Sequence, residues 1–161
     1  MRLSTKGRYA VMAMVDLAAN SNGHPVALAD IAERQEISLS YLEQLFAKLR
    51  KGGLVKSVRG PGGGYLLAHT ADTTRISDII LAVDEPIRTT RCANITPQGC
   101  RTNRSRCLTH DLWEELGNQI HMYLSSVTVA DVVERRVIGT SALTLKPVAG
   151  PDAEGAAVAA E

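Results

Sequence analysis

The sequence is poor in aromatic residues and has no long hydrophobic run. Only 4% of its 161 residues are Phe, Trp or Tyr, so a core must consist mainly of Leu, Val, Ile, Ala and Met. No stretch approaches the roughly 20 apolar residues that a membrane span requires, and no signal-peptide cleavage pattern follows the first residues. We therefore expect a cytoplasmic protein with no membrane partner. The length fits one compact domain with appendages and excludes a large multi-domain enzyme.

Cysteine is also scarce, and the three cysteines, Cys92, Cys100 and Cys107, are close together in the sequence. In the reducing cytosol such an odd set favours metal or redox chemistry over a disulfide framework. The absence of a Cys-x-x-Cys pair argues against a thiol oxidoreductase. No Gly-Lys-Ser/Thr follows the glycines of residues 60–64, which argues against nucleotide hydrolysis. We expect a protein that is not an enzyme.

The net charge of +1 conceals an uneven distribution along the chain. Residues 1–75 carry 10 Lys and Arg against 6 Asp and Glu, a net charge of +4, whereas residues 111–161 carry 3 against 8, a net charge of −5. A basic N-terminal part is typical of a protein whose N-terminal half approaches the phosphates of nucleic acid.

Helical periodicity near the N-terminus predicts a helix-turn-helix unit. Residues 9–19 are apolar nearly all round, and residues 28–35 place apolar side chains on one face. Ser40 and Glu43 match a capping box at the start of a third helix, with Ser38 as an alternative cap. The apolar stripe of that helix consists of Leu42, Leu45, Phe46 and Leu49. A short helix, a tight turn and a longer helix are typical of helix-turn-helix proteins, although many other helical proteins contain them.

A β-hairpin with a glycine-rich tip is expected next. The β-like residues 54–58 and 65–67 flank Arg59 and the Gly-Pro-Gly-Gly-Gly of residues 60–64. A cation on such a tip can meet phosphates or enter a minor groove, whereas the alternative is a plain solvated turn. We interpret the hairpin as the wing of a winged helix-turn-helix domain, so the fold is mainly α with a small β wing.

The second half of the chain is predicted to contain a loop and a long helix. A short helix is expected over residues 76–83. Residues 84–106 show no hydrophobic periodicity and are expected to form a loop. From Thr109 apolar residues recur at intervals of three and four residues, which predicts a long amphipathic helix with an acidic first turn. A further short helix is expected over residues 128–136. We expect a disordered tail from residue 139. The expected division is a DNA-binding domain (1–83), a ligand-binding loop (84–110), C-terminal helices (111–136) and a tail (137–161).

The cysteines and one histidine form the most specific motif. The pattern Cys92-x7-Cys100-x6-Cys107-x2-His110 places three thiols and an imidazole within nineteen residues, and these donors suit zinc or an iron–sulfur cluster. Arginines among them favour thiolates and offset the negative charge of a cluster. The gaps are longer than in usual zinc knuckles, but the spacing leaves zinc and iron–sulfur unresolved. His110 is alternatively an ordinary residue in the first turn of a helix.

Four segments of the chain, MRLSTKGRYAV, ISLSYLEQLFAKLRKGGLV, SVRGPGGGYLL and RCLTHDLW, are similar to known proteins. They resemble the iron–sulfur cluster regulators of the Rrf family of winged-helix bacterial regulators, over residues 1 to about 135. The resemblance implies a homodimer whose long C-terminal dimerisation helix pairs across the two-fold. It also implies that the recognition helix enters the major groove of palindromic double-stranded DNA, with the wing alongside. The implied DNA contacts are Ser38, Ser40, Tyr41, Glu43, Gln44, Arg59, Gly60, Gly62 and Gly63.

The same resemblance implies a 2Fe-2S cluster, supplied by the iron–sulfur assembly machinery and bound by Cys92, Cys100, Cys107 and His110. A cluster-loaded form would repress the genes for cluster assembly, and a cluster-free form would still act at other promoters as an activator or repressor. The gaps between the cysteines are longer than in the better-known members, which leaves the cluster type open. A zinc-stabilised winged-helix repressor and a sensor of nitric oxide or redox stress remain alternatives.

Overall fold

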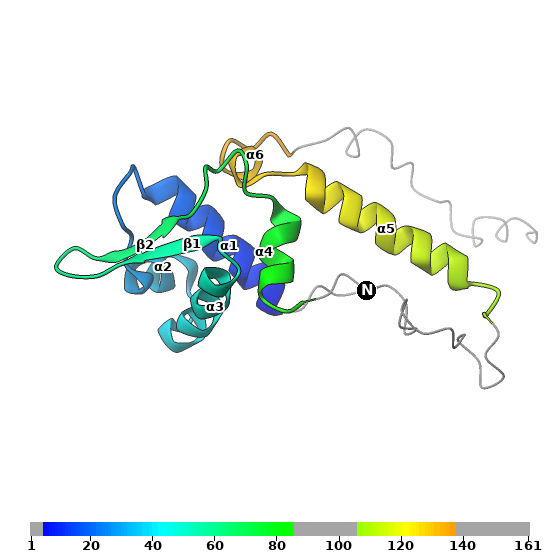
Figure 1. Ribbon diagram of the computed structural model, residues 1–161, viewed down its shortest axis with the longest axis horizontal. Helices are drawn as coiled ribbons and strands as arrows, with labels where there is room; N and C mark the ends of the chain where they lie inside the picture. Colours follow the sequence, from blue (N-terminus) through cyan, green and yellow to red (C-terminus); the bar gives the residue numbers. More distant parts are fainter. Residues whose placement is uncertain (1–4, 86–105, 138–161) are drawn as a thin grey trace, which may run out of the picture.

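The computed structural model describes residues 5–85 and 106–137 (Figure 1). The element order is α1 (Thr5–Asn20), α2 (Leu28–Gln35), α3 (Leu39–Lys51), β1 (Val55–Val58), β2 (Gly64–Leu67), α4 (Ile76–Ala82), α5 (His110–Ser126) and α6 (Val129–Val133). This order confirms the expected mainly helical fold with one hairpin. Cys92, Cys100 and the expected tail from residue 139 lie outside the described residues.

The helix-turn-helix unit is formed by α2 and α3. Helix α2 ends at Gln35. The next residue, Glu36, has a left-handed backbone (φ 53°) and donates its N–H to the carbonyls of Ala32 and Glu33 in the last turn. Buried Ile37 then donates its N–H to the Ala32 carbonyl at 3.1 Å, and this fixes the tight turn. The extended residue Ser38 is the N-cap, so α3 begins at Leu39. The expected capping box at Ser40 is therefore wrong, because Ser40 already lies inside the helix.

The wing is an antiparallel pair of strands. Val55 pairs with Leu67 and Val58 pairs with Gly64, so β1 and β2 meet over their full lengths. An additional bridge joins Tyr65 to Val26, which precedes α2. The hairpin is thus attached to the segment before α2 through β2, while its tip projects from the body (Figure 1).

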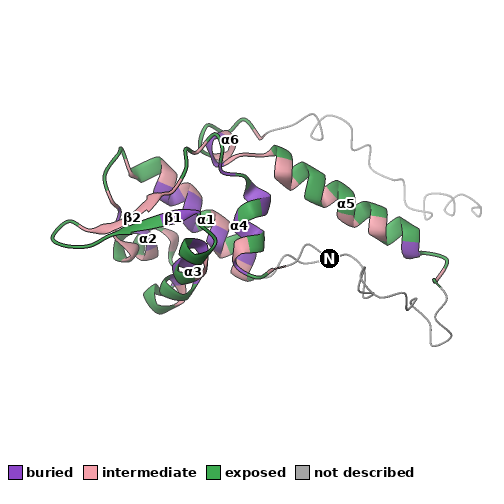
Figure 2. Cartoon of the chain, viewed as in Figure 1, coloured by how far each residue is buried: buried purple, intermediate pink, exposed green. Residues whose placement is uncertain are grey.

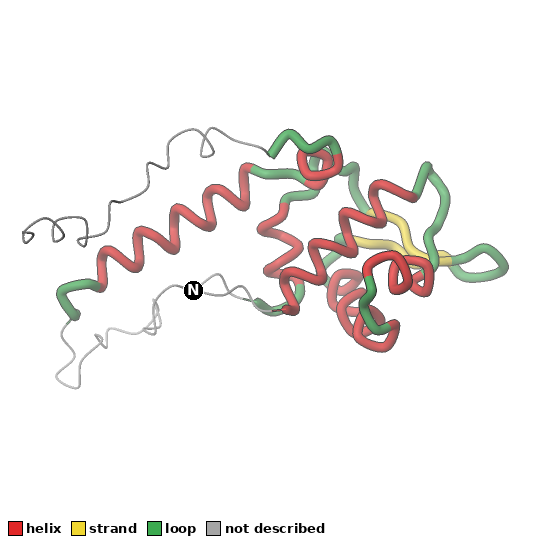
Figure 3. Tube along the Cα trace, turned by 180° about the vertical axis from the view of Figure 1, so that it is seen from behind, coloured by secondary structure: helices red, strands yellow, loops and turns green. Residues whose placement is uncertain are grey.

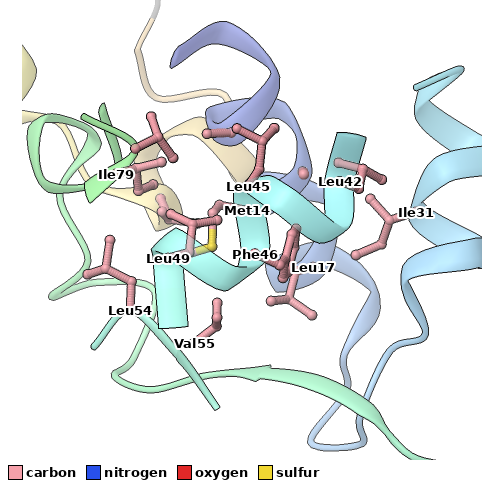
Figure 4. Packing of buried hydrophobic residues seen from close by; sticks show 14 of the residues in the cluster. Met14, Leu17, Ile31, Leu42, Leu45, Phe46, Leu49, Leu54, Val55 and Ile79 are labelled. Carbon is pink, nitrogen blue, oxygen red and sulfur yellow. The ribbon is translucent and has the colours of Figure 1, made fainter. Parts of the chain in front are cut away.

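The core lies between α1, α3, α4 and the base of the hairpin (Figure 4). The expected stripe of α3 is confirmed: Leu42, Leu45, Phe46 and Leu49 are all buried. Phe46 forms an edge-to-face pair with Tyr65 of β2, with ring centroids 4.9 Å apart. Met14 and Leu17 of α1 pack in the same cluster. The packing holds the polar face of α3 outward, as the burial colours in Figure 2 show.

Helix α5 stands apart from this body and projects away from it in the direction opposite to the wing (Figures 1 and 3). It is anchored at its C-terminal end, where Ile76 donates its N–H to the Val127 carbonyl and Arg75 donates to the carbonyl of Ser125. A capping box of Thr128 and Asp131 then starts α6. No helix among the described residues is long and apolar enough to cross a membrane.

Candidate DNA interface and cluster site

The outer face of α3 carries the side chains expected to contact DNA. Ser38, Ser40, Glu43 and Gln44 are exposed. Tyr41 differs from the expectation of a solvent-facing residue: it is half-buried, and its ring packs edge-to-face on Tyr9 with centroids 6.0 Å apart. The packing of Tyr41 leaves four of the five predicted recognition-helix contacts on an open surface.

The start of α3 leaves its hydroxyl groups available for a ligand. The Ser38 side chain makes no capping hydrogen bond, and the Ser38 carbonyl instead accepts the N–H groups of Tyr41 and Leu42 at 3.1 Å. No acidic residue occupies the first turn of this helix. A helix N-terminus with exposed hydroxyls and no acidic residue in its first turn can bind phosphate and so position a recognition helix on DNA.

A buried carboxylate positions α2 against α1, a feature that the sequence analysis did not identify. The side chain of Asp16 is 3% exposed and that of Arg34 38%. Arg34 donates from Nη2 to Asp16 Oδ1 at 2.6 Å and from Nε to both carboxylate oxygens at 3.1 and 3.2 Å, and Gln35 Nε2 donates to Oδ2 at 2.7 Å. Burial raises the pKa of Asp16, but the hydrogen bonds from Arg34 and Gln35 outweigh it and lower the pKa below its usual value.

A second pair ties the end of α4 to α3. Lys48 is half-buried, and its Nζ lies 2.7 Å from Asp84 Oδ2. The hydrogen bond from Lys48 lowers the pKa of Asp84. The next residue, Glu85, accepts the Gly7 N–H at 2.6 Å, and a Cβ on Gly7 would come within 2.7 Å of the same carboxylate oxygen. Lys48 therefore holds the chain where it enters the cysteine-bearing segment and does not point freely toward phosphates.

The wing tip has the geometry that its glycines were expected to provide. Gly60 and Gly62 adopt positive φ values of 109° and 72°, which residues other than glycine rarely adopt. At Gly63 a Cβ would lie 2.5 Å from the Val58 carbonyl oxygen. Arg59 is exposed at the edge of this turn. The glycines are thus required by the turn itself, and Arg59 is the charged group that the turn presents.

At the other end of the molecule, Cys107 and His110 lie one turn apart where α5 begins. His110 donates its backbone N–H to the Cys107 carbonyl at 3.0 Å. The imidazole of His110 is 7% exposed, whereas Cys107 is half-exposed with its Sγ 3.7 Å from Thr109 Oγ1. A thiol and an imidazole on one turn at a positive helix end fit an iron–sulfur cluster or zinc.

Two carboxylates also lie beside His110. Its Nε2 is 3.7 Å from Glu114 Oε2, and one ligand atom each of His110, Asp111 and Glu114 lie within 4.8 Å of one another. A carboxylate next to a metal-binding histidine commonly orients the imidazole ring. Asp111 is exposed and faces Arg106 at 3.4 Å.

Known proteins show the same fold and much of the same sequence. The family model Rrf2, described as an iron-dependent transcriptional regulator, matches residues 3–135. The chain belongs to the Rrf2 family. The HTH-type transcriptional regulator IscR of Yersinia pestis is 54% identical over 138 residues, which cover 86% of this chain and 82% of that protein.

Solved structures of Rrf2-type regulators agree with this assignment. IscR of T. potens is 40% identical with a TM-score of 0.68, covering 84% of this chain and 88% of that chain. CymR (YrzC), the global cysteine regulator of B. subtilis, is 33% identical with a TM-score of 0.69, covering 84% of this chain and 98% of that chain. The winged-helix fold and the role of a transcription regulator of the IscR type, rather than an enzyme, are therefore confirmed for this Rrf2 protein.

Proposed function

We propose that this Rrf2 protein is a cytoplasmic homodimer that binds palindromic double-stranded DNA. It holds a 2Fe-2S cluster through Cys92, Cys100, Cys107 and His110, and represses cluster assembly genes when loaded. The iron–sulfur assembly machinery would be the cluster donor. The observation that carries the proposal is the position of Cys107 and a nearly buried His110 on one turn at the N-terminal end of α5. Soft thiolate and imidazole donors are the ligands that suit a bound cluster.

The exposed apolar face of α5 supports the homodimer. At 100° per residue, six of the seven large apolar side chains of α5 fall within about 120° of the helix circumference, and Met122 lies outside this arc. The six are Leu112, Trp113, Leu116, Ile120, Tyr123 and Leu124. Four of the six are among the exposed large hydrophobic residues of the chain, and a monomer in water would be destabilised by such a surface. A second copy of α5 is the occupant that matches this stripe in length and character.

Dimerisation can be tested on two residues of α5 that face different directions. Leu116 lies near the middle of the stripe, and the exposed Met122 lies about 120° around the helix from it. We expect Leu116→Glu to give a monomer in sedimentation velocity and Met122→Glu to remain a dimer. A dimer in both variants would show that the stripe is not the interface.

The distribution of polar and basic groups supports DNA as the partner. Ser38, Ser40, Glu43 and Gln44 lie on the outer face of α3, and Arg59 lies at the tip of the wing. In winged-helix proteins the N-terminal residues of such a helix reach base edges in the major groove. A wing cation favours phosphates or the minor groove. The domain 1–83 is thus the part that would read DNA.

A bound cluster would supply a reversible signal that depends on iron and sulfide. The chain's own residues would determine how the ligand is held: Cys107 and His110 from the first turn of α5, with Glu114 placed to orient the imidazole. CymR, described as a global cysteine regulator, has the same fold, so the architecture alone does not determine which signal is sensed. For this chain the three cysteines and His110 favour the cluster.

The test is to measure the iron, sulfide and zinc content of the protein purified without oxygen. We expect iron and inorganic sulfide in equal amounts with visible absorption, and repression of a cluster assembly promoter that is lost when the cluster is removed by a chelator. Zinc without sulfide would overturn the cluster and leave a zinc-stabilised repressor. A loaded protein whose repression responds to nitric oxide but not to cluster supply would favour a stress sensor.

A further inference from the structure

The DNA-facing side of α3 carries one large apolar side chain. Leu39, the first residue of the helix, is 41% exposed. The remaining leucines of α3 and Phe46 are buried in the core. Helix α3 is described in full, so Leu39 is its single large aliphatic group that faces solvent.

The neighbours of Leu39 place it within the proposed recognition surface. Ser38 and Ser40 on either side are exposed, and Glu43, one helical turn further on, is exposed as well. The N-terminal residues of a recognition helix are those that approach base edges in the major groove. Leu39 therefore lies where base edges would be, among polar side chains that hydrogen-bond.

We propose that Leu39 recognises thymine by contact of its isobutyl group with the thymine 5-methyl in the major groove. This inference rests on the DNA-binding mode proposed above. The 5-methyl is the apolar group that the base edges present in this groove, and it is recognised by contact with apolar side-chain groups. A serine hydroxyl can contact several bases, and a carboxylate such as Glu43 pairs with the cytosine amino group. Leu39 thus supplies a preference for thymine that the other residues of this face do not provide.

The alternative is that Leu39 is an ordinary exposed leucine, which is common at protein surfaces. Leu81 of α4 provides the matched control because it is a leucine of similar exposure, 48%, on a different helix. Leu39→Met retains an apolar group of similar size at the proposed contact. Neither Leu39→Ala nor Leu81→Ala removes a core side chain, so both variants are expected to fold, and their circular dichroism spectra would verify it.

The experiment uses full-length, cluster-loaded protein and duplexes that the wild type enriches from a randomised library. Each thymine is replaced singly by deoxyuracil, which removes only the methyl group. We expect the wild type to lose about fourfold in affinity at one thymine of each half-site, the effect of one buried methyl. Leu39→Ala should bind the unmodified duplex more weakly by a similar factor and show no further loss with deoxyuracil there. Leu81→Ala and Leu39→Met should respond as the wild type does.

Equal sensitivity of wild type and Leu39→Ala at every thymine would overturn the role of Leu39, and so would the absence of any sensitive thymine. Failure of the wild type to enrich any sequence would instead overturn the DNA-binding mode itself. The two failures are therefore distinguishable in one experiment.

Discussion

Replacing Arg34 by alanine would remove the principal hydrogen-bond donor of the Asp16 carboxylate, which would remain buried. Arg34 provides three hydrogen bonds to that carboxylate and Gln35 provides one. Breaking a buried ion pair on one side costs about 3 to 5 kcal/mol. Since the Arg34 side chain is 38% exposed, solvent screens the pair and the lower end applies, about 3 kcal/mol in the free energy of unfolding at neutral pH.

The reciprocal change is expected to be milder. Asp16→Asn retains an acceptor for Arg34, and the partly exposed guanidinium can regain water, so we expect a loss of about 1 to 2 kcal/mol. In the Arg34→Ala background the sign should reverse: Asp16→Asn should stabilise, because it removes a buried charge that has lost its counterion. The exposed Arg50 serves as the control, and Arg50→Ala should change stability by less than about 0.5 kcal/mol.

The same pair predicts a dependence on pH. The folded-state pKa of Asp16 is lowered, so its stabilisation is present above the unfolded value of about 3.9 and is lost as the pH falls through the lower folded value. Urea unfolding followed by circular dichroism, at one protein concentration, would measure the wild type, both single variants, the double variant and the Arg50→Ala control at neutral and acid pH. Equal stability of Arg34→Ala and wild type, or a further loss on adding Asp16→Asn, would refute the role of the pair.

Further predictions concern DNA and cluster binding. Arg59→Ala should weaken binding to all sequences alike and reduce the slope of log affinity against log salt by roughly 1 per lost phosphate contact in each subunit; an unchanged slope in a salt titration would remove Arg59 from the interface. Gln44→Ala should cost about 1 to 3 kcal/mol at particular base pairs in a competition assay, and a uniform loss would contradict base recognition. His110→Ala should purify with less cluster and His110→Cys should hold it longer under a fixed chelator challenge, followed by visible absorbance; equal lifetimes would leave His110 as a helix first-turn residue.

The elements with strong local patterns were predictable from the sequence. The stripe of α3 from Leu42 to Leu49 follows the helical period and is buried as expected. The wing follows from its glycines, because positive φ at Gly60 and Gly62 is a local requirement. The error at the start of α3 has a tertiary cause. Ile37 is buried, and its position sets the turn two residues before the Ser40 capping pattern would begin the helix.

The contacts that position α2 and α3 were not predictable because they join residues far apart in the sequence. Asp16 was recognisable as a single charge in an apolar helix, but nothing local identifies Arg34 as its partner. Lys48 and Asp84 are separated by 36 residues, and Lys48 has the pattern of an ordinary surface lysine. Single-sequence periodicity reports which face of a helix is buried, whereas such pairs depend on how the helices pack.

The two ends of the cysteine-bearing segment are attached to the DNA-binding body in different ways. At one end, Glu85 is held by Gly7 and the adjacent Asp84 by Lys48 of the recognition helix. At the other end, Cys107 leads into α5, a helix about 25 Å long at 1.5 Å per residue, which contacts the DNA-binding body at its far end near Val127. Under the proposed ligand set, cluster binding would connect the segment that follows Asp84 and Glu85 to the N-terminal end of α5. The shorter route from Cys92 to the recognition helix therefore runs along the chain to Glu85 and Asp84 and then through the ion pair of Asp84 with Lys48, and the route along α5 is the longer one.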